Sequence, residues 1–179
     1  MKGIVFTEFL DMVEQSYGAR MVDDILNESD LESGGAYTSV GTYDHRELLE
    51  IVSALSEKTG TPVQTLVQGY GKHLFGRFSR LMPQFFKDQK SSFDFFETVD
   101  NHIHVEVRKI YPDAALPEFD TVRDGNTMEM TYRSRCPFAD FADGLIRGCI
   151  EHFGETVEIN SEDKNKEGTF SRVFRMVRK

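Results

Sequence analysis

The chain has 179 residues and a formal net charge of −9, with 39% hydrophobic and 28% charged residues. These values are typical of one soluble globular domain, and the excess of acidic residues argues against a nucleic-acid or anionic-membrane surface. No apolar run has membrane-spanning length, the N-terminus lacks the pattern of a secretory signal, and two cysteines are too few for a disulfide framework or a Cys-rich zinc site. We therefore expect a cytoplasmic protein.

The first half of the chain is predicted to be helical. The spacing of apolar residues predicts helices over 3–17 and 20–27, followed by a polar loop with an extended piece at Tyr37–Val40. Asp44 has the residue type and position of an N-cap, with Glu47 three residues later as in a capping box, and this helix runs to Gly60. Pro62 then opens the next helix at a first-turn position.

A long helix is predicted within the segment Phe93–Pro117 and carries two histidines. Its apolar residues recur at intervals of three and four and end before Pro112, which cannot continue a helix: Phe96, Val99, Ile103, Val107 and Ile110. His102 and His104 lie on opposite flanks of that stripe, about 200° apart. The two side chains therefore cannot reach the same small ligand, and the period does not choose between them.

Beyond this helix the apolar residues follow the alternating pattern of short strands. Strands are predicted over 118–122 and 127–134 with a turn at Gly125-Asn126, then a helix over 138–153 and strands over 156–160 and 169–178. This order predicts an α+β fold, in which an N-terminal helical part precedes a part with the histidine-bearing helix and an antiparallel sheet of about four strands. We expect a single domain, 1–179, with subdomains 1–60 and 61–179.

A half-buried histidine on such a helix has two interpretations. The common one is a core-edge imidazole that is hydrogen-bonded to a backbone carbonyl. The other is an axial ligand of a haem iron, because neutral imidazole is a good iron donor within an apolar cavity. The helical period alone leaves both interpretations open.

Several short motifs favour the haem interpretation. They are the Met-Lys-Gly start, His104 seven residues before Tyr111-Pro112, Pro117, Tyr132-Arg133-Ser134, and a following helix that contains Gly144-Leu145-Ile146. With these motifs the whole chain resembles the H-NOX family of haem-based nitric oxide and oxygen sensors, which includes the haem domain of soluble guanylate cyclase. The resemblance implies haem b (iron protoporphyrin IX) as cofactor and selects His104 as its proximal ligand.

The family holds the haem propionates with a Tyr-x-Ser-x-Arg motif. Tyr132 and Ser134 match it, and two residues apart on a strand they share a face, so both hydroxyls can reach one carboxylate. The third position is Cys136, which departs from the motif. Arg135 can replace the missing cation if the strand ends before Pro137; otherwise one propionate is held less tightly.

The resemblance also identifies positions that face the bound gas. Correspondence with the family places Phe9, Leu74 and Phe141 at the pocket positions where oxygen-binding members carry a hydrogen-bonding tyrosine and its polar support. None of the three side chains can donate a hydrogen bond, which favours nitric oxide over oxygen. Val5 and Pro117 fall where family members press on the haem and distort it.

We therefore expect a non-enzymatic gas sensor for nitric oxide, with carbon monoxide as a further ligand. The resemblance implies that nitric oxide weakens the iron–His104 bond, and that the signal passes to a separate partner, a histidine kinase or a cyclic-di-GMP enzyme. Three alternatives remain: an oxygen sensor, a redox sensor that uses the haem or Cys136, and a haem-free helical binding module. Cys136 is the better thiol candidate because it precedes a helix N-terminus, whereas Cys149 is expected in the core.

Overall fold

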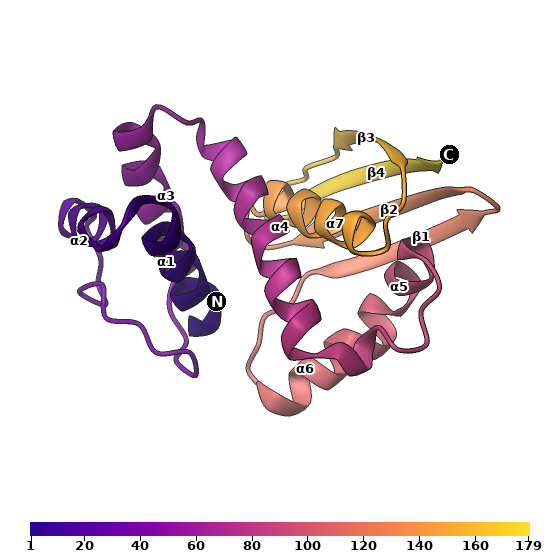
Figure 1. Cartoon of the computed structure of the whole chain (residues 1–179), viewed down its shortest axis with the longest axis horizontal. Helices are drawn as coiled ribbons and strands as arrows, with labels where there is room; N and C mark the ends of the chain where they lie inside the picture. Colours follow the sequence, from indigo (N-terminus) through magenta and orange to yellow (C-terminus); the bar gives the residue numbers. More distant parts are fainter. The chain divides into compact units, whose positions relative to one another are not determined.

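The structure is a computed structural model that describes residues 1–179 and comprises two compact units, Met1–Tyr70 and Gly71–Lys179 (Figure 1). The first unit is helical, and the second contains the sheet and the histidine-bearing helix. This confirms the α+β class. The boundary lies inside α4 (Val63–Leu81), ten residues later than the subdomain limit expected from the sequence.

The first unit contains α1 (Gly3–Tyr17), α2 (Ala19–Glu28), α3 (His45–Thr59) and the start of α4. Gly18 ends α1 with a φ of 86°, and Gly60 ends α3 with a φ of 69°, a region that favours glycine. The fully buried side chains come from the apolar stripes of the first three helices: Phe6, Phe9, Val13, Ile25, Ile51 and Leu55. The helices predicted for this part of the chain are confirmed.

Two local details in the first unit differ from expectation. The predicted loop is present, but its piece Tyr37–Val40 ends in a turn at Ser39 and Val40, and the Tyr37 ring stacks on Phe6 at 4.5 Å between ring centroids. Asp44 does cap α3, but its carboxylate accepts from the backbone N–H of Arg46. Glu47 makes no reciprocal cap, because its buried carboxylate accepts hydrogen bonds from the Ser33 and Tyr37 hydroxyls and so holds the loop against α3.

The second unit is built on a four-stranded antiparallel sheet. Its strands are β1 (Glu118–Asp124), β2 (Thr127–Ser134), β3 (Val157–Asp163) and β4 (Phe170–Arg178), in the spatial order β1-β2-β4-β3. Gly125, with a φ of 55°, makes the predicted turn between the first two strands. The register places Met128 beside Met176 and Tyr132 beside Arg172.

Two helices, α5 (Ser92–Thr98) and α7 (Ala139–His152), contribute to the core on one face of this sheet (Figure 1). Alternate residues of β2 and β4 point into that core because successive side chains of a strand alternate between faces. The core contains Phe93, Phe96, Met128, Met130, Tyr132, Ile146, Cys149, Phe174 and Met176. Ion pairs such as Arg133–Asp120 and Arg175–Glu129 join the exposed side chains of neighbouring strands.

The second half of α4 packs closely on α7, and glycines allow the approach. A Cβ atom added at Gly71 would lie 2.2 Å from the backbone oxygen of Phe141. One added at Gly148 would lie 2.8 Å from the Cβ of Phe75 and 3.1 Å from the backbone oxygen of Lys72. A Lys72–Glu151 ion pair at 2.5 Å joins the same two helices.

The predicted long helix is interrupted by a π turn. Its parts are α5, the π segment Val99–Ile103, and α6 (His104–Ile110). The backbone N–H of His104 donates to the carbonyl of Val99, five residues earlier, where an α-helix would use the fourth. The expected apolar stripe is correspondingly broken, since Phe96 is 4% exposed whereas Ile110 is 60% exposed.

Candidate functional site

The structure distinguishes the two histidines. His104 begins α6 directly after the π turn and is 9% exposed, whereas His102 lies on the exposed side of the same segment. The π turn explains this difference, because the extra residue in the turn changes the angular positions that a regular helix would give to both rings. His104 is therefore the histidine placed toward the interior of the second unit.

The imidazole of His104 has one polar partner within hydrogen-bonding distance. Its Nδ1 lies 3.0 Å from Oδ1 of Asp100, one turn earlier on the helix. Burial lowers the pKa of His104 below its usual value, and the hydrogen bond to Asp100 offsets this only in part. A neutral imidazole is thus favoured at neutral pH, so the contact is a hydrogen bond to a carboxylate rather than an ion pair.

Aromatic rings connect His104 to the sheet. The centroid of its ring lies 5.9 Å from that of Phe119 on β1, and Phe119 lies 5.6 Å from Tyr132 on β2. Phe119 and Tyr132 are also register partners across the two strands. The histidine therefore lies beside an aromatic surface, which suits an apolar macrocycle.

Tyr132 and Ser134 lie at the end of β2, around Cys136. The Tyr132 hydroxyl donates to the carbonyl of Cys136 at 3.2 Å, and the backbone N–H of Cys136 donates to Oγ of Ser134 at 3.0 Å. Tyr132 is 2% exposed, and its burial raises the pKa of the phenol. Both groups are neutral hydroxyls that can turn toward an anionic oxygen.

The cation expected beside these hydroxyls is exposed. β2 ends at Ser134, before Pro137, which was the condition for Arg135 to replace the missing cation. The Arg135 side chain is exposed and makes no ion pair in the described chain. Arg172, the register partner of Tyr132, is occupied by Asp163 and Asp140, each at 2.6 Å. Arg135 is therefore the cation next to Ser134 that remains available.

Three further predicted site residues belong to the second unit. Leu74 is 1% exposed on α4, and Phe141 is half-buried on α7, where its backbone faces Gly71 of α4. Pro117 is half-buried directly before β1. The close packing of α4 on α7 thus brings the two apolar positions onto adjoining helices.

Val5 and Phe9 belong to α1 in the first unit. Phe9 is completely buried and packs edge-on against Tyr70, with 5.1 Å between ring centroids. The Tyr70 hydroxyl donates its one proton to the backbone carbonyl of Val5. Burial raises the pKa of Tyr70 well above its usual value, so this group remains protonated.

Both cysteines are free thiols. Cys149 is completely buried, and burial raises the pKa of its thiol well above the usual value, as expected for a small core residue. Cys136 is half-buried.

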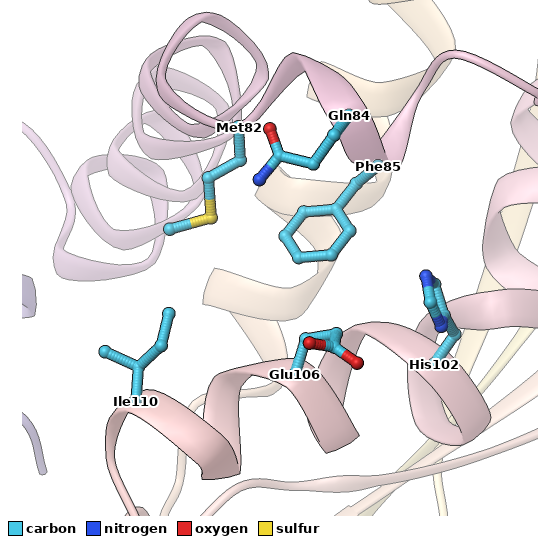
Figure 2. A pocket seen from close by; sticks show the side chains of 6 residues that line it. All are labelled: Met82, Gln84, Phe85, His102, Glu106 and Ile110. Carbon is cyan, nitrogen blue, oxygen red and sulfur yellow. The ribbon is translucent and has the colours of Figure 1, made fainter.

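A separate open groove of about 380 Å³ lies between the segment 82–85 and the helical segment that carries His102, as Figure 2 shows. Its lining combines apolar and polar side chains: Met82, Gln84, Phe85, His102, Glu106 and Ile110. The His102 ring lies 6.0 Å from that of Phe85, and Glu106 pairs with Lys109 at 2.5 Å. His102, the exposed histidine, therefore lines this groove, whereas His104 is buried in the second unit.

The donor chemistry around His104 fits a haem iron. The imidazole is buried, neutral, hydrogen-bonded to a carboxylate and close to the Phe119 ring, all of which favour iron ligation by the second ring nitrogen. Asp100 and Phe119 were missed by the sequence analysis. The four-residue spacing of Asp100 and His104 was a usable signal, whereas the position of Phe119 depends on how the strand packs against the helix.

The chain was compared with known families and structures. The family described as Haem-NO-binding matches residues 2–161. The Fe(II) unliganded H-NOX protein from K. algicida is 39% identical, with a TM-score of 0.93, 100% of this chain and 97% of that chain covered. The IWP-051-bound H-NOX from Shewanella woodyi in the Fe(II)CO state is 40% identical, with a TM-score of 0.84 and coverage of 100% and 95%.

A mutant of the T. tengcongensis H-NOX is 25% identical, with a TM-score of 0.89 and coverage of 100% and 98%. No protein with curated functional information matches the chain. None of the helices is both long enough and apolar enough to span a membrane.

Proposed function

The chain belongs to the Haem-NO-binding (H-NOX) family of haem-based gas sensors, and from this premise we propose that it senses nitric oxide with a haem b held by His104. The observation that carries the proposal is the buried, neutral imidazole of His104 beside Asp100 and Phe119. When bound, the haem supplies a ferrous iron that takes a diatomic gas. The protein supplies the axial nitrogen and the apolar surroundings.

The propionates are proposed to bind at the end of β2. The Ser134 hydroxyl would donate a hydrogen bond, and the Tyr132 hydroxyl would do so after turning away from the Cys136 carbonyl, its present acceptor. The unpaired guanidinium of Arg135 would supply the positive charge that Cys136 cannot. Val5 and Pro117 are proposed to contact the haem and bend it, following the family resemblance. Both are half-buried, so each has surface that a ligand can cover.

The gas preference is proposed to follow from missing hydrogen-bond donors. With haem bound, oxygen at the iron would gain from a hydrogen-bond donor because its outer atom would carry negative charge, whereas nitric oxide would polarise much less. Phe9, Leu74 and Phe141 offer no donor, and the proton of Tyr70 is committed to the carbonyl of Val5. One missing charge-assisted hydrogen bond costs oxygen about 1.5–3 kcal/mol, or roughly one to two decades in affinity.

We propose that the signal passes to a separate protein, either a histidine kinase or a cyclic-di-GMP enzyme. Support for this partner class comes from the family resemblance. The expected result is that the activity of such an enzyme changes when the haem-loaded chain is exposed to nitric oxide, measured as autophosphorylation or cyclic-di-GMP turnover. The same mixture with the haem-free chain is the control.

Absorption spectra test the central assignment. Reduced, haem-loaded protein is measured first without gas, then in air, then with nitric oxide, for wild type, His104→Gly and His102→Gly. We expect wild type and His102→Gly to give a five-coordinate spectrum that is unchanged in air and responds strongly to nitric oxide. If His104→Gly ligates haem as wild type does, the assignment of His104 is wrong.

A further inference from the structure

We propose that Asp100 is a positioning residue that acts on His104. Asp100 holds the His104 imidazole in one tautomer and strengthens the iron–histidine bond, so that nitric oxide breaks this bond less readily. The inference rests on the proposed function, because it concerns the same ligand. It goes further because it states that the strength of the iron–histidine bond depends on Asp100, a carboxylate that does not itself bind the haem. The ease with which nitric oxide breaks that bond would then depend on Asp100 as well.

The geometry supports a directed hydrogen bond. Oδ1 of Asp100 lies 3.0 Å from Nδ1 of His104, which is within the usual range for an N–H donor and a carboxylate. The His104 side chain is 11% exposed and that of Asp100 is 37% exposed. The carboxylate therefore keeps contact with water while its inner oxygen is directed at the buried ring.

The π turn makes this pair part of an irregular element. Asp100 lies inside the π segment Val99–Ile103, and His104 is the first residue after it. π turns appear mostly as single turns inside α-helices and are frequent at functional sites, so the presence of one beside the candidate ligand agrees with a positioning role. The Phe119 ring lies 5.9 Å from the His104 ring, measured between centroids, and offers no competing hydrogen-bond acceptor.

The chemical consequence follows from the tautomer. A carboxylate can only accept from Nδ1, so Nδ1 carries the hydrogen and Nε2 presents its lone pair to the metal. A charged acceptor on Nδ1 also makes Nε2 a more basic ligand, which strengthens its bond to iron. With haem bound, nitric oxide would have to displace this stronger ligand, so His104 would be lost from the iron more slowly than it would be without Asp100.

The test compares variants that separate the negative charge of Asp100, its hydrogen-bond acceptor oxygen and the position of its carboxylate. Asp100→Asn keeps an acceptor oxygen but removes the charge, whereas Asp100→Ala removes both. Glu106→Gln is the matched control, because Glu106 is a carboxylate of the same helical segment that pairs with Lys109 instead. Asp100→Glu tests rescue by a longer carboxylate.

Two measurements are made on the reduced, haem-loaded proteins. Resonance Raman spectra of the gas-free state report the iron–histidine stretch, which should move to lower frequency in Asp100→Asn and further in Asp100→Ala. Stopped-flow absorption after nitric oxide addition reports the rate of histidine loss, which should rise about 10-fold in Asp100→Ala. Glu106→Gln should match wild type in both.

A third measurement does not require haem. Nitrogen-15 NMR of the haem-free protein should show His104 with its hydrogen on Nδ1 in wild type and a mixture of tautomers in Asp100→Ala. This readout keeps the inference testable if one variant binds haem poorly. A wild-type tautomer in Asp100→Ala would contradict the inference.

The outcomes also separate this inference from the proposed function. If the Asp100 variants match wild type in stretch and rate while His104→Gly loses axial ligation, the Asp100 inference is overturned and the sensor proposal stands. If His104→Gly retains wild-type ligation, the sensor proposal itself fails.

Discussion

At the scale of single residues, the two histidines show what a sequence can and cannot decide. The helical period gave His102 and His104 equivalent positions, and only the family resemblance selected His104. The structure buries His104 and exposes His102 because of the π turn, a feature set by backbone hydrogen bonds that residue type does not encode. Its role as iron ligand remains a prediction for the spectra.

Arg135 is predicted to replace the missing arginine of the propionate motif. Arg135→Ala should weaken haem binding by about 1.5–3 kcal/mol, or one to two decades, because a charge-assisted hydrogen bond is lost. The measurement is the rate of haem transfer to an excess of haem-free myoglobin. Arg133→Ala is the control, because Arg133 pairs with Asp120, and it should behave as wild type. Equal rates for both variants would exclude Arg135 from propionate binding.

Phe141 is predicted to keep the gas site free of donors. Phe141→Tyr adds one hydroxyl at a half-buried position and should raise oxygen affinity by roughly one to two decades, with little change for nitric oxide. Oxygen titration of the reduced protein measures the effect, and Phe141→Leu controls for the loss of the native ring. A tyrosine variant with unchanged oxygen affinity would contradict the placement of Phe141 in the pocket.

At the scale of elements, most boundaries could be predicted because caps, turns and periods are local signals. Asp44, Gly60 and Gly125 each mark an observed start, end or turn. The exceptions depend on distant partners. The loop at Tyr37 is held by the stacking of its ring on Phe6, and Glu47 bonds that loop rather than closing a capping box.

The approach of α7 to α4 is predicted to depend on Gly148. Gly148→Ala should lower the free energy of unfolding by about 1–3 kcal/mol, because its Cβ would lie 2.8 Å from the Cβ of Phe75 and would force the helices apart. Gly76→Ala is the control, since a Cβ there meets nothing within 4 Å, and it should be neutral or stabilising by up to about 1 kcal/mol. Urea unfolding followed by circular dichroism gives both values. Similar losses for the two variants would contradict the packing argument.

At the scale of the whole molecule, the net negative charge says little about the free energy of unfolding, because the count of charges does not show which of them are paired. The net charge of −9 includes many acids that are paired in the fold. One cluster of ion pairs lies between α5 and β1, where the Arg123 guanidinium bonds Asp94 at 2.7 Å and Glu97 at 3.2 Å. The same guanidinium lies 5.7 Å from the centre of the Phe93 ring.

Asp94 is predicted to contribute to acid sensitivity. The hydrogen bond from Arg123 lowers the pKa of Asp94 in the folded state, so its contribution is complete above the unfolded pKa, near 4, and is lost as the pH falls through the lower folded pKa. Urea unfolding should therefore show a smaller drop in stability from pH 7 to pH 3 for Asp94→Asn than for wild type. Asp120→Asn, at an exposed pair, should keep the wild-type drop. An unchanged drop in Asp94→Asn would contradict the contribution of this pair.

The π turn has a consequence for how this chain should be aligned and engineered. One surplus residue within a helix is a phase offset of about 100°, so a helical wheel drawn from Ser92 to Ile110 misassigns every side chain on one side of it. Deleting a single residue from Val99–Ile103 would restore a regular ladder of hydrogen bonds and, at the same time, rotate the half of the helix that carries His104 relative to the half that carries Phe96. A one-residue deletion there should therefore disturb ligation more than a conservative substitution at any one of its five positions.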